Sequence, residues 1–78
     1  MDDKPAQKYA VILAYSTSRA LRAEKLLLGA GISCKLIPVP RHLSSDCGVC
    51  LRIDKTDEAR ARQVLEAAKI EIEGIHDF

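Results

Sequence analysis

The residues best suited to chemistry lie together in residues 38–50, which read Pro-Val-Pro-Arg-His-Leu-Ser-Ser-Asp-Cys-Gly-Val-Cys. Cys47 is the candidate reactive group, because the thiolate form of cysteine is the nucleophile. Four neighbours could stabilise an anion on its sulfur: Arg41, Ser44, Ser45 and Gly48. The arginine contributes a permanent positive charge, the serines contribute hydroxyl and amide donors, and the glycine permits a turn in which successive N–H groups point at one anion. These surroundings favour a thiolate, a persulfide anion or a selenosulfide anion on Cys47.

Other interpretations of these cysteines stay open. Cys47 could be a buried structural cysteine in a tight turn, although the polarity of the loop argues against that. Cys47 and Cys50 also have the Cys-x-x-Cys spacing of disulfide oxidoreductases, in which the pair opens a helix after a strand. Here the pair leads into residues 51–53, which have a strand pattern, so this activity is disfavoured. Cys50 is then either a resolving thiol, which attacks sulfur bound on Cys47, or an incidental cysteine on the sheet.

A metal site is also disfavoured. Structural zinc needs four ligands, and the candidates are Cys34, Cys47, Cys50 and His42. Cys34 falls on the strand face that should meet the helices, which is typical of a core residue, and His76 lies in an expected tail. We therefore expect no metal.

The flanking pattern predicts the elements that position this loop. Strands are expected at residues 9–15, 33–37, 49–53 and 70–73, with Pro38 and Pro40 leaving the sheet. The first helix is expected over residues 19–30, capped by one of Ser16, Thr17 and Ser18 and closed by Gly31 and Ile32. The second is capped by Asp54 or Thr56 and carries apolar residues at helical spacing through Ala68.

The order β-α-β-β-α-β predicts an α+β, ferredoxin-like sandwich: a four-stranded antiparallel sheet with two helices on one face. The residues expected to face the helices are Val49, Leu51, Ile53, Ile70 and Ile72. Those expected on the open face are Cys50, Arg52, Glu71 and Glu73. The first strand is apolar on both faces, and we expect Val11 and Leu13 to point toward the helices, because the second helix buries small residues. With an open face of this kind we expect a monomer or a weak dimer.

Composition limits the class of protein. With 78 residues the chain is too short for an enzyme with a deep cleft, and we expect a flexible N-terminus over 1–7, one domain over 8–75 and a tail over 76–78. A net charge of +1 gives no basic field for nucleic acid. No apolar run approaches the roughly 20 residues of a membrane span. The odd count of 3 cysteines is untypical of a secreted disulfide scaffold, so we expect reduced thiols in the cytoplasm.

Two stretches of the chain resemble a known family. Residues 14–27 resemble the opening of the small bacterial family of selenium/sulfur carrier-like proteins, and residues 38–48 are similar to its central Pro-x-Pro-Arg, Ser-Ser and Cys-Gly motif. The resemblance spans about residues 8 to 73. The positions that match the family's proposed site are Arg41, Ser44, Ser45, Cys47 and Gly48. Cys50 has no assigned place in the family pattern.

The resemblance implies a carrier rather than a stand-alone enzyme. Cys47 would accept sulfur or selenium from a donor of the cysteine desulfurase type and pass it to an acceptor of the TusA type, without a cofactor. The chain lacks the Cys-Pro-x-Pro motif of the TusA carriers, because Ile37 stands where their cysteine would be. Two alternatives are a non-catalytic interaction or ligand-sensing module and a redox switch that pairs Cys47 with Cys50.

Overall fold

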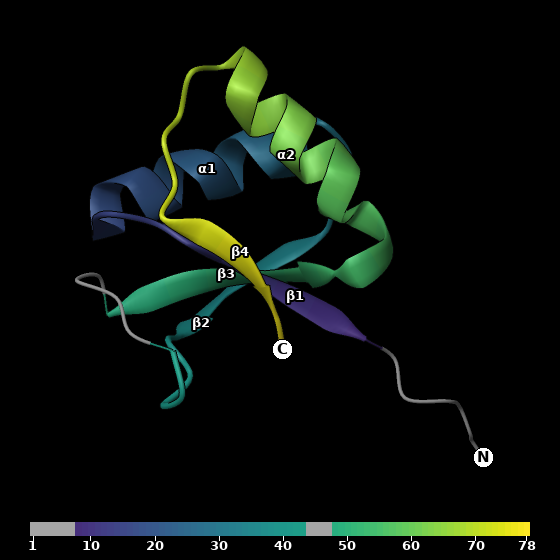
Figure 1. Ribbon diagram of the computed structural model, residues 1–78. Coiled ribbons are helices and arrows are strands. Elements are labelled where there is room, and N and C mark those ends of the chain that lie inside the picture. Colours follow the sequence, from purple (N-terminus) through teal and green to yellow (C-terminus); the bar gives the residue numbers. More distant parts are fainter. Residues whose placement is uncertain (1–7, 44–47) are drawn as a thin grey trace.

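The structure, a computed structural model, describes residues 8–43 and 48–78. The elements in chain order are β1 (Tyr9–Leu13), α1 (Thr17–Gly29), β2 (Cys34–Pro38), β3 (Val49–Asp54), a short 3-10 helix (Lys55–Asp57), α2 (Glu58–Ala67) and β4 (Gly74–Asp77). The strands form one antiparallel sheet in the order β2-β3-β1-β4, and both helices cover the same face (Figure 1). The predicted ferredoxin-like α+β fold is confirmed.

Helix α1 begins and ends close to the predicted residues. The Ser16 hydroxyl caps its start by accepting a hydrogen bond from the Arg19 N–H at 3.2 Å. At its end Gly31 adopts a left-handed φ of 81°, and the Ile32 N–H donates to the Leu27 carbonyl at 2.9 Å. Because Ile32 and Leu27 are both buried, this closure also fixes the helix against the core.

The last strand lies later in the chain than predicted. Residues 70–73 form no strand, and β4 starts at Gly74, which pairs with Leu13, and ends at Asp77. The alternation of isoleucine and glutamate over residues 70–73 arises because Ile70 and Ile72 pack against the core while the chain descends from α2 to the sheet. His76 and Asp77, which were expected in the tail, therefore belong to the sheet. Strand β2 also runs one residue further than predicted, through Pro38.

The larger core lies between the helices and the sheet. Ile12 of β1 and Leu51 and Ile53 of β3 pack there against Leu27 of α1 and Leu65 of α2. All five side chains are almost completely buried, as the alternation over β3 predicted for Leu51 and Ile53. This layer buries most of the large apolar side chains, so it carries most of the hydrophobic stabilisation.

A second, smaller cluster lies on the opposite face of the sheet, and it corrects one prediction. Val11 and Leu13 point away from the helices, because Ile12 faces them and side chains alternate along a strand. They pack with Cys50 beneath partly buried side chains from β2 and the following loop: Ile37, Val39 and Leu43. The prediction that Val11 and Leu13 fill volume beneath the helices was wrong, because the loop after β2 buries these side chains on the other face of the sheet.

None of the helices in the described segments is long and apolar enough to cross a membrane.

Candidate functional site

The candidate loop is a long hairpin connection between β2 and β3. Pro38 pairs with Val49 at its base, and the Val39 N–H donates to the Gly48 carbonyl at 3.2 Å. The Leu43 N–H donates to the Pro40 carbonyl at 3.0 Å, which closes a tight turn over residues 40–43. These two bonds hold the start of the loop in a defined shape.

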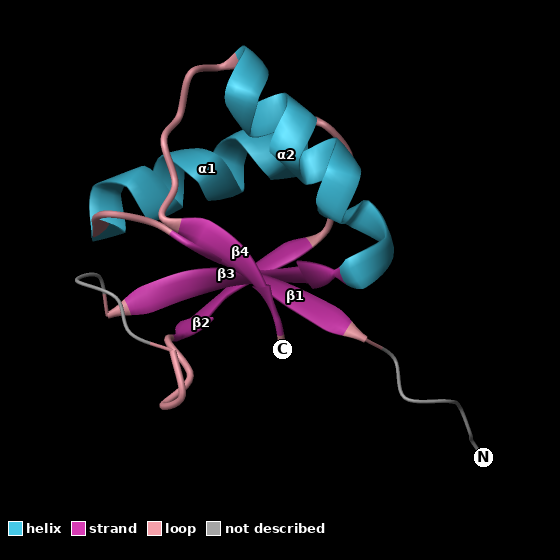
Figure 2. Cartoon of the chain, in the orientation of Figure 1, coloured by secondary structure: helices cyan, strands magenta, loops and turns pink. Residues whose placement is uncertain are grey.

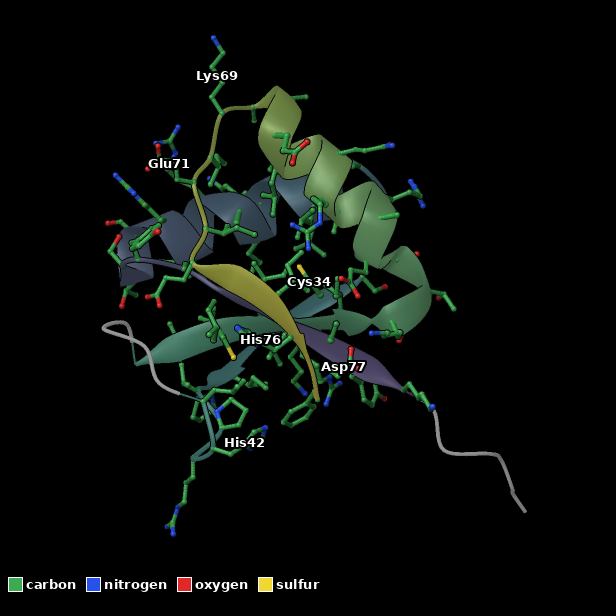
Figure 3. All side chains as sticks on the ribbon, in the orientation of Figure 1. Cys34, His42, Lys69, Glu71, His76 and Asp77 are labelled. Carbon is green, nitrogen blue, oxygen red and sulfur yellow. The ribbon has the colours of Figure 1, made fainter. Side chains whose placement is uncertain are left out.

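The start of the loop is also fastened to the sheet by its side chains. Val39 and Leu43 pack on the cluster formed by Val11, Leu13 and Cys50. Arg41 and His42, between them, are exposed, and the His42 side chain lies on the side of the sheet away from the helices (Figure 3). The turn therefore has an apolar underside and a polar outer surface, which the sequence pattern did not reveal.

The structure describes part of the predicted site. Arg41 lies at the tip of the turn and Gly48 at the end of the loop, where both are exposed. A Cβ added at Gly48 would meet no atom within 4 Å. Ser44, Ser45 and Cys47 lie outside the described residues, as does Asp46.

Cys50 is on the predicted face of β3, but it is completely buried. Its side chain has 0% exposure, and its S–H donates to the Pro38 carbonyl at 3.9 Å. Leu43 and Val39 of the loop pack against the cluster that contains it. A thiol in this position meets no solvent while the start of the loop stays in place.

Cys34 is on the other face of the sheet, as predicted. It packs against the helix-side core, and its S–H donates to the Glu24 carbonyl at 3.8 Å. Loss of hydration, together with the negative charge of Glu24, raises the pKa of the Cys34 thiol above its ordinary value. This environment disfavours the thiolate, so Cys34 has the character of a structural cysteine.

The positions of these thiols bear on the zinc hypothesis. Cys34 and Cys50 lie on opposite faces of one sheet, so they cannot ligate one ion. Figure 3 shows the same separation between Cys34, beneath the helices, and His42, below the sheet. In residues 8–43 and 48–78, no three His, Cys, Asp or Glu side chains gather as a metal site would require.

The candidate loop shares its end of the sheet with two other segments. Leu13, the last residue of β1, pairs with Cys50 near the start of β3 and with Gly74 at the start of β4. The entry to α1, the end of the candidate loop and the end of the segment that leads from α2 to β4 therefore meet at this end, as Figure 2 shows.

A known family model matches most of the chain. The model of the family described as "Putative Se/S carrier protein-like" matches residues 8–77, which include every element of the fold and the whole candidate loop. No curated protein and no solved structure matches the chain. On the strength of a family match that runs from β1 to β4, the chain belongs to the Se/S carrier protein-like family.

Proposed function

We propose that this protein carries sulfur or selenium covalently on Cys47 and delivers it to an acceptor protein. Membership of the family supports carriage as the general function. The observation that carries the proposal is the construction of the loop: an apolar underside bound to the sheet and a polar side open to solvent. A carrier thiol has to be reached by two different proteins, and a loop held in this way can present one.

The transfer is an exchange between sulfur atoms. The Cys47 thiolate attacks the terminal sulfur of a donor persulfide, a new S–S bond forms, and the donor leaves as a thiolate. In the second half the acceptor thiolate attacks the terminal sulfur on Cys47, and the Cys47 thiolate leaves. Selenium follows the same route as a selenosulfide. Neither half consumes an oxidant or reductant, so no cofactor is needed.

The residues around Cys47 have electrostatic roles in this proposal. Arg41 supplies a positive charge beside the loaded anion, and the serines and the Gly48 amide supply hydrogen-bond donors. Charge of this kind lowers the free energy of both the thiolate and the loaded persulfide anion. A substitution at Arg41 should therefore slow loading without affecting the fold, since its side chain is exposed.

We further propose that Cys50 acts as a resolving thiol. Its thiolate would attack the inner sulfur on Cys47, forming a disulfide and releasing the bound chalcogen as hydrosulfide or hydroselenide. Burial beneath Val39 and Leu43 holds Cys50 back from that reaction, so the loaded form is protected while the loop stays closed.

The donor and acceptor belong to the proposal as well. We infer a donor of the cysteine desulfurase type, an acceptor of the TusA type and a cytoplasmic location in which the three thiols stay reduced. Each partner needs only brief contact with Cys47, which suits a monomer or a weak dimer with an accessible loop.

Intact mass spectrometry tests the proposal. After incubation with a cysteine desulfurase and cysteine, we expect the protein to gain the mass of one sulfur atom, and to lose it on addition of a thiol reductant. Cys47→Ser should gain nothing, whereas Cys34→Ser and Cys50→Ser should load like the native protein. Loading of Cys47→Ser, or no loading of the native protein, would contradict the proposal.

A further inference from the structure

A polar pocket of about 270 Å³ lies beside the first half of α1, between that helix and the segment that follows α2. The residues that line it are Arg19, Arg22, Lys69, Ile70 and Glu71. Three of these side chains are cationic and one is anionic. We call the arginines and Lys69, with the space between them, the basic pocket.

The positive charge of the basic pocket is only partly compensated. Arg19 lies 3.8 Å from Glu71, but both side chains are largely exposed, at 48% and 80%, so this contact is weak. Within the described segments no ion pair reaches Arg22 or Lys69. In Figure 3 the Lys69 side chain extends away from Glu71 into solvent. Both cations are therefore available to a ligand from outside.

The positions of two positive charges on α1 destabilise the isolated helix. Arg19 lies in the first turn, which contains no acidic residue, although the N-terminal end of a helix favours negative charge. Arg22 follows at i+3, where like charges repel. Each effect slightly destabilises an exposed helix. An anion bound between the two arginines would remove both costs, which makes this end of α1 a place where an anion is favoured.

A second hollow adjoins the basic pocket. It has a volume of about 530 Å³ and is lined by Tyr15, Glu66 and Ile72 together with three residues that it shares with the basic pocket, Lys69, Ile70 and Glu71. Tyr15 is 49% exposed, which is high for a large aromatic side chain. A single small anion would fill only the basic pocket. The continuous surface suits a peptide that carries carboxylates beside an apolar side chain.

This surface lies at the end of the sheet that carries the candidate loop. Tyr15 follows β1, Glu71 precedes β4, and the first residues of β3 lead back to Cys47. The pairing of Leu13 with both Cys50 and Gly74 holds these three connections together. A protein bound here would therefore lie at the end of the sheet where β3 begins.

We propose that the basic pocket and the adjoining Tyr15, Ile70 and Ile72 groove dock an acidic segment of the protein that exchanges the chalcogen with Cys47. This inference rests on the proposed carrier function, for which it supplies the partner-binding surface. The carboxylates of the segment pair with Arg19 and Arg22, and its apolar side chain lies in the groove. Docking would raise the local concentration of the partner's reactive group beside the loop.

Fluorescence anisotropy with a labelled peptide, Glu-Glu-Leu-Phe-Glu-Glu, tests the docking surface. We expect saturable binding below about 1 mM that weakens as salt is added. The double variant Arg19→Gln/Arg22→Gln should weaken binding about tenfold, since two charged contacts are lost. The matched control Lys25→Gln/Arg62→Gln removes the same charge from α1 and α2 outside the basic pocket, and it should bind like the native protein.

Three further measurements make the outcome decisive. A peptide with glutamine in place of glutamate should not bind, and inorganic phosphate at the same concentration should not displace the acidic peptide. The arginine double variant should remain folded, as its circular dichroism spectrum would show. Equal binding by the two double variants, binding of the glutamine peptide, or displacement by phosphate would overturn the inference.

The carrier function is tested separately from the docking surface. Loading of Cys47 by a small persulfide donor requires no docked partner, so the arginine double variant should gain one sulfur as fast as the native protein. If the native protein fails to load, the proposed function is wrong. If it loads but the two double variants bind the acidic peptide equally, the docking inference alone is wrong.

Discussion

The two faces of the sheet are covered in different ways. On one face, α1 and α2 bury a continuous core that includes Ile12, Leu27 and Leu65. On the other face, a few side chains from one loop, led by Leu43, cover a cluster around Cys50. The core on the first face supplies most of the stability of the fold. The cluster on the second face anchors the candidate loop to the sheet. A change on the second face should therefore alter the chemistry of the loop before it threatens the fold.

The largest expected effect is the loss of a helix-side core residue. Leu27→Ala should lower the free energy of unfolding by about 2–5 kcal/mol, because Leu27 is completely buried between α1 and the sheet. Urea unfolding followed by circular dichroism measures this change. The neighbouring Leu28 is 53% exposed, so Leu28→Ala should cost less than about 0.5 kcal/mol. Equal effects of the two substitutions would show that the helix layer does not carry the stability.

A smaller effect on stability, with a larger effect on the site, is expected on the loop side. Leu43→Ala should cost about 1 kcal/mol, since Leu43 is only partly buried. It should also expose the Cys50 thiol, so that labelling of Cys50 by a thiol reagent becomes severalfold faster in native conditions. His42→Ala, at the exposed neighbour, is the control. Unchanged labelling of Cys50 in Leu43→Ala would mean that the loop does not protect this thiol.

Substitutions that follow the C-terminal ends of α1 and α2 should change the free energy of unfolding by similar amounts in opposite directions. Gly31 ends α1 at a left-handed φ of 81°, and Lys69 holds the equivalent place after α2 at a φ of 59°. Gly31→Ala should lower the free energy of unfolding by about 1 kcal/mol, and Lys69→Gly should raise it by about the same amount, because a Cβ is unfavourable in this conformation. Thermal unfolding measures both. Neither substitution should change the labelling of Cys50. A change would show that the stability of the helix layer and the protection of Cys50 are coupled.

The smallest effect is an alkaline loss of stability that comes from Cys34. Burial raises the pKa of this thiol in the folded state above the ordinary value of 9.0. Its contribution to stability is therefore complete below that value and is lost as the pH rises toward the folded-state pKa, since the unfolded chain releases the proton first. Urea titrations at a series of pH values above 8 should show a steeper decline for the native protein than for Cys34→Ser. Parallel declines would place the Cys34 thiol in an environment like water.

Most of the fold could be predicted from the sequence because local signals and packing agree there. Ser16 and Gly31 mark the ends of α1, and the alternation around Leu51 marks β3 with its correct face. The last strand was misplaced because Ile70 and Ile72 pack on the core as a descending segment, which produces the same alternation as a strand.

The position of the candidate loop could be predicted from the sequence, but its packing against the sheet could not. Prolines, polar residues and Cys47 between two strand patterns identify the loop. Nothing in the sequence indicates that Val39 and Leu43 fold back to bury Cys50, because two separate apolar residues in a polar loop are ordinary. The face of Val11 was equally hidden, since a strand that is apolar on both sides does not reveal which side meets the helices. Only the register and the long-range contacts settle such questions.

Competitive alkylation of the three cysteines in the folded protein tests the central claim most directly. With limiting iodoacetamide over a range of pH, followed by peptide mapping, we expect Cys47 to be labelled first and at the lowest pH. Cys34 should react slowly until the pH exceeds its ordinary pKa of 9.0, and Cys50 should stay protected beneath the loop. Faster labelling of Cys34 or Cys50 than of Cys47 would contradict the assignment of Cys47 as the carrier thiol.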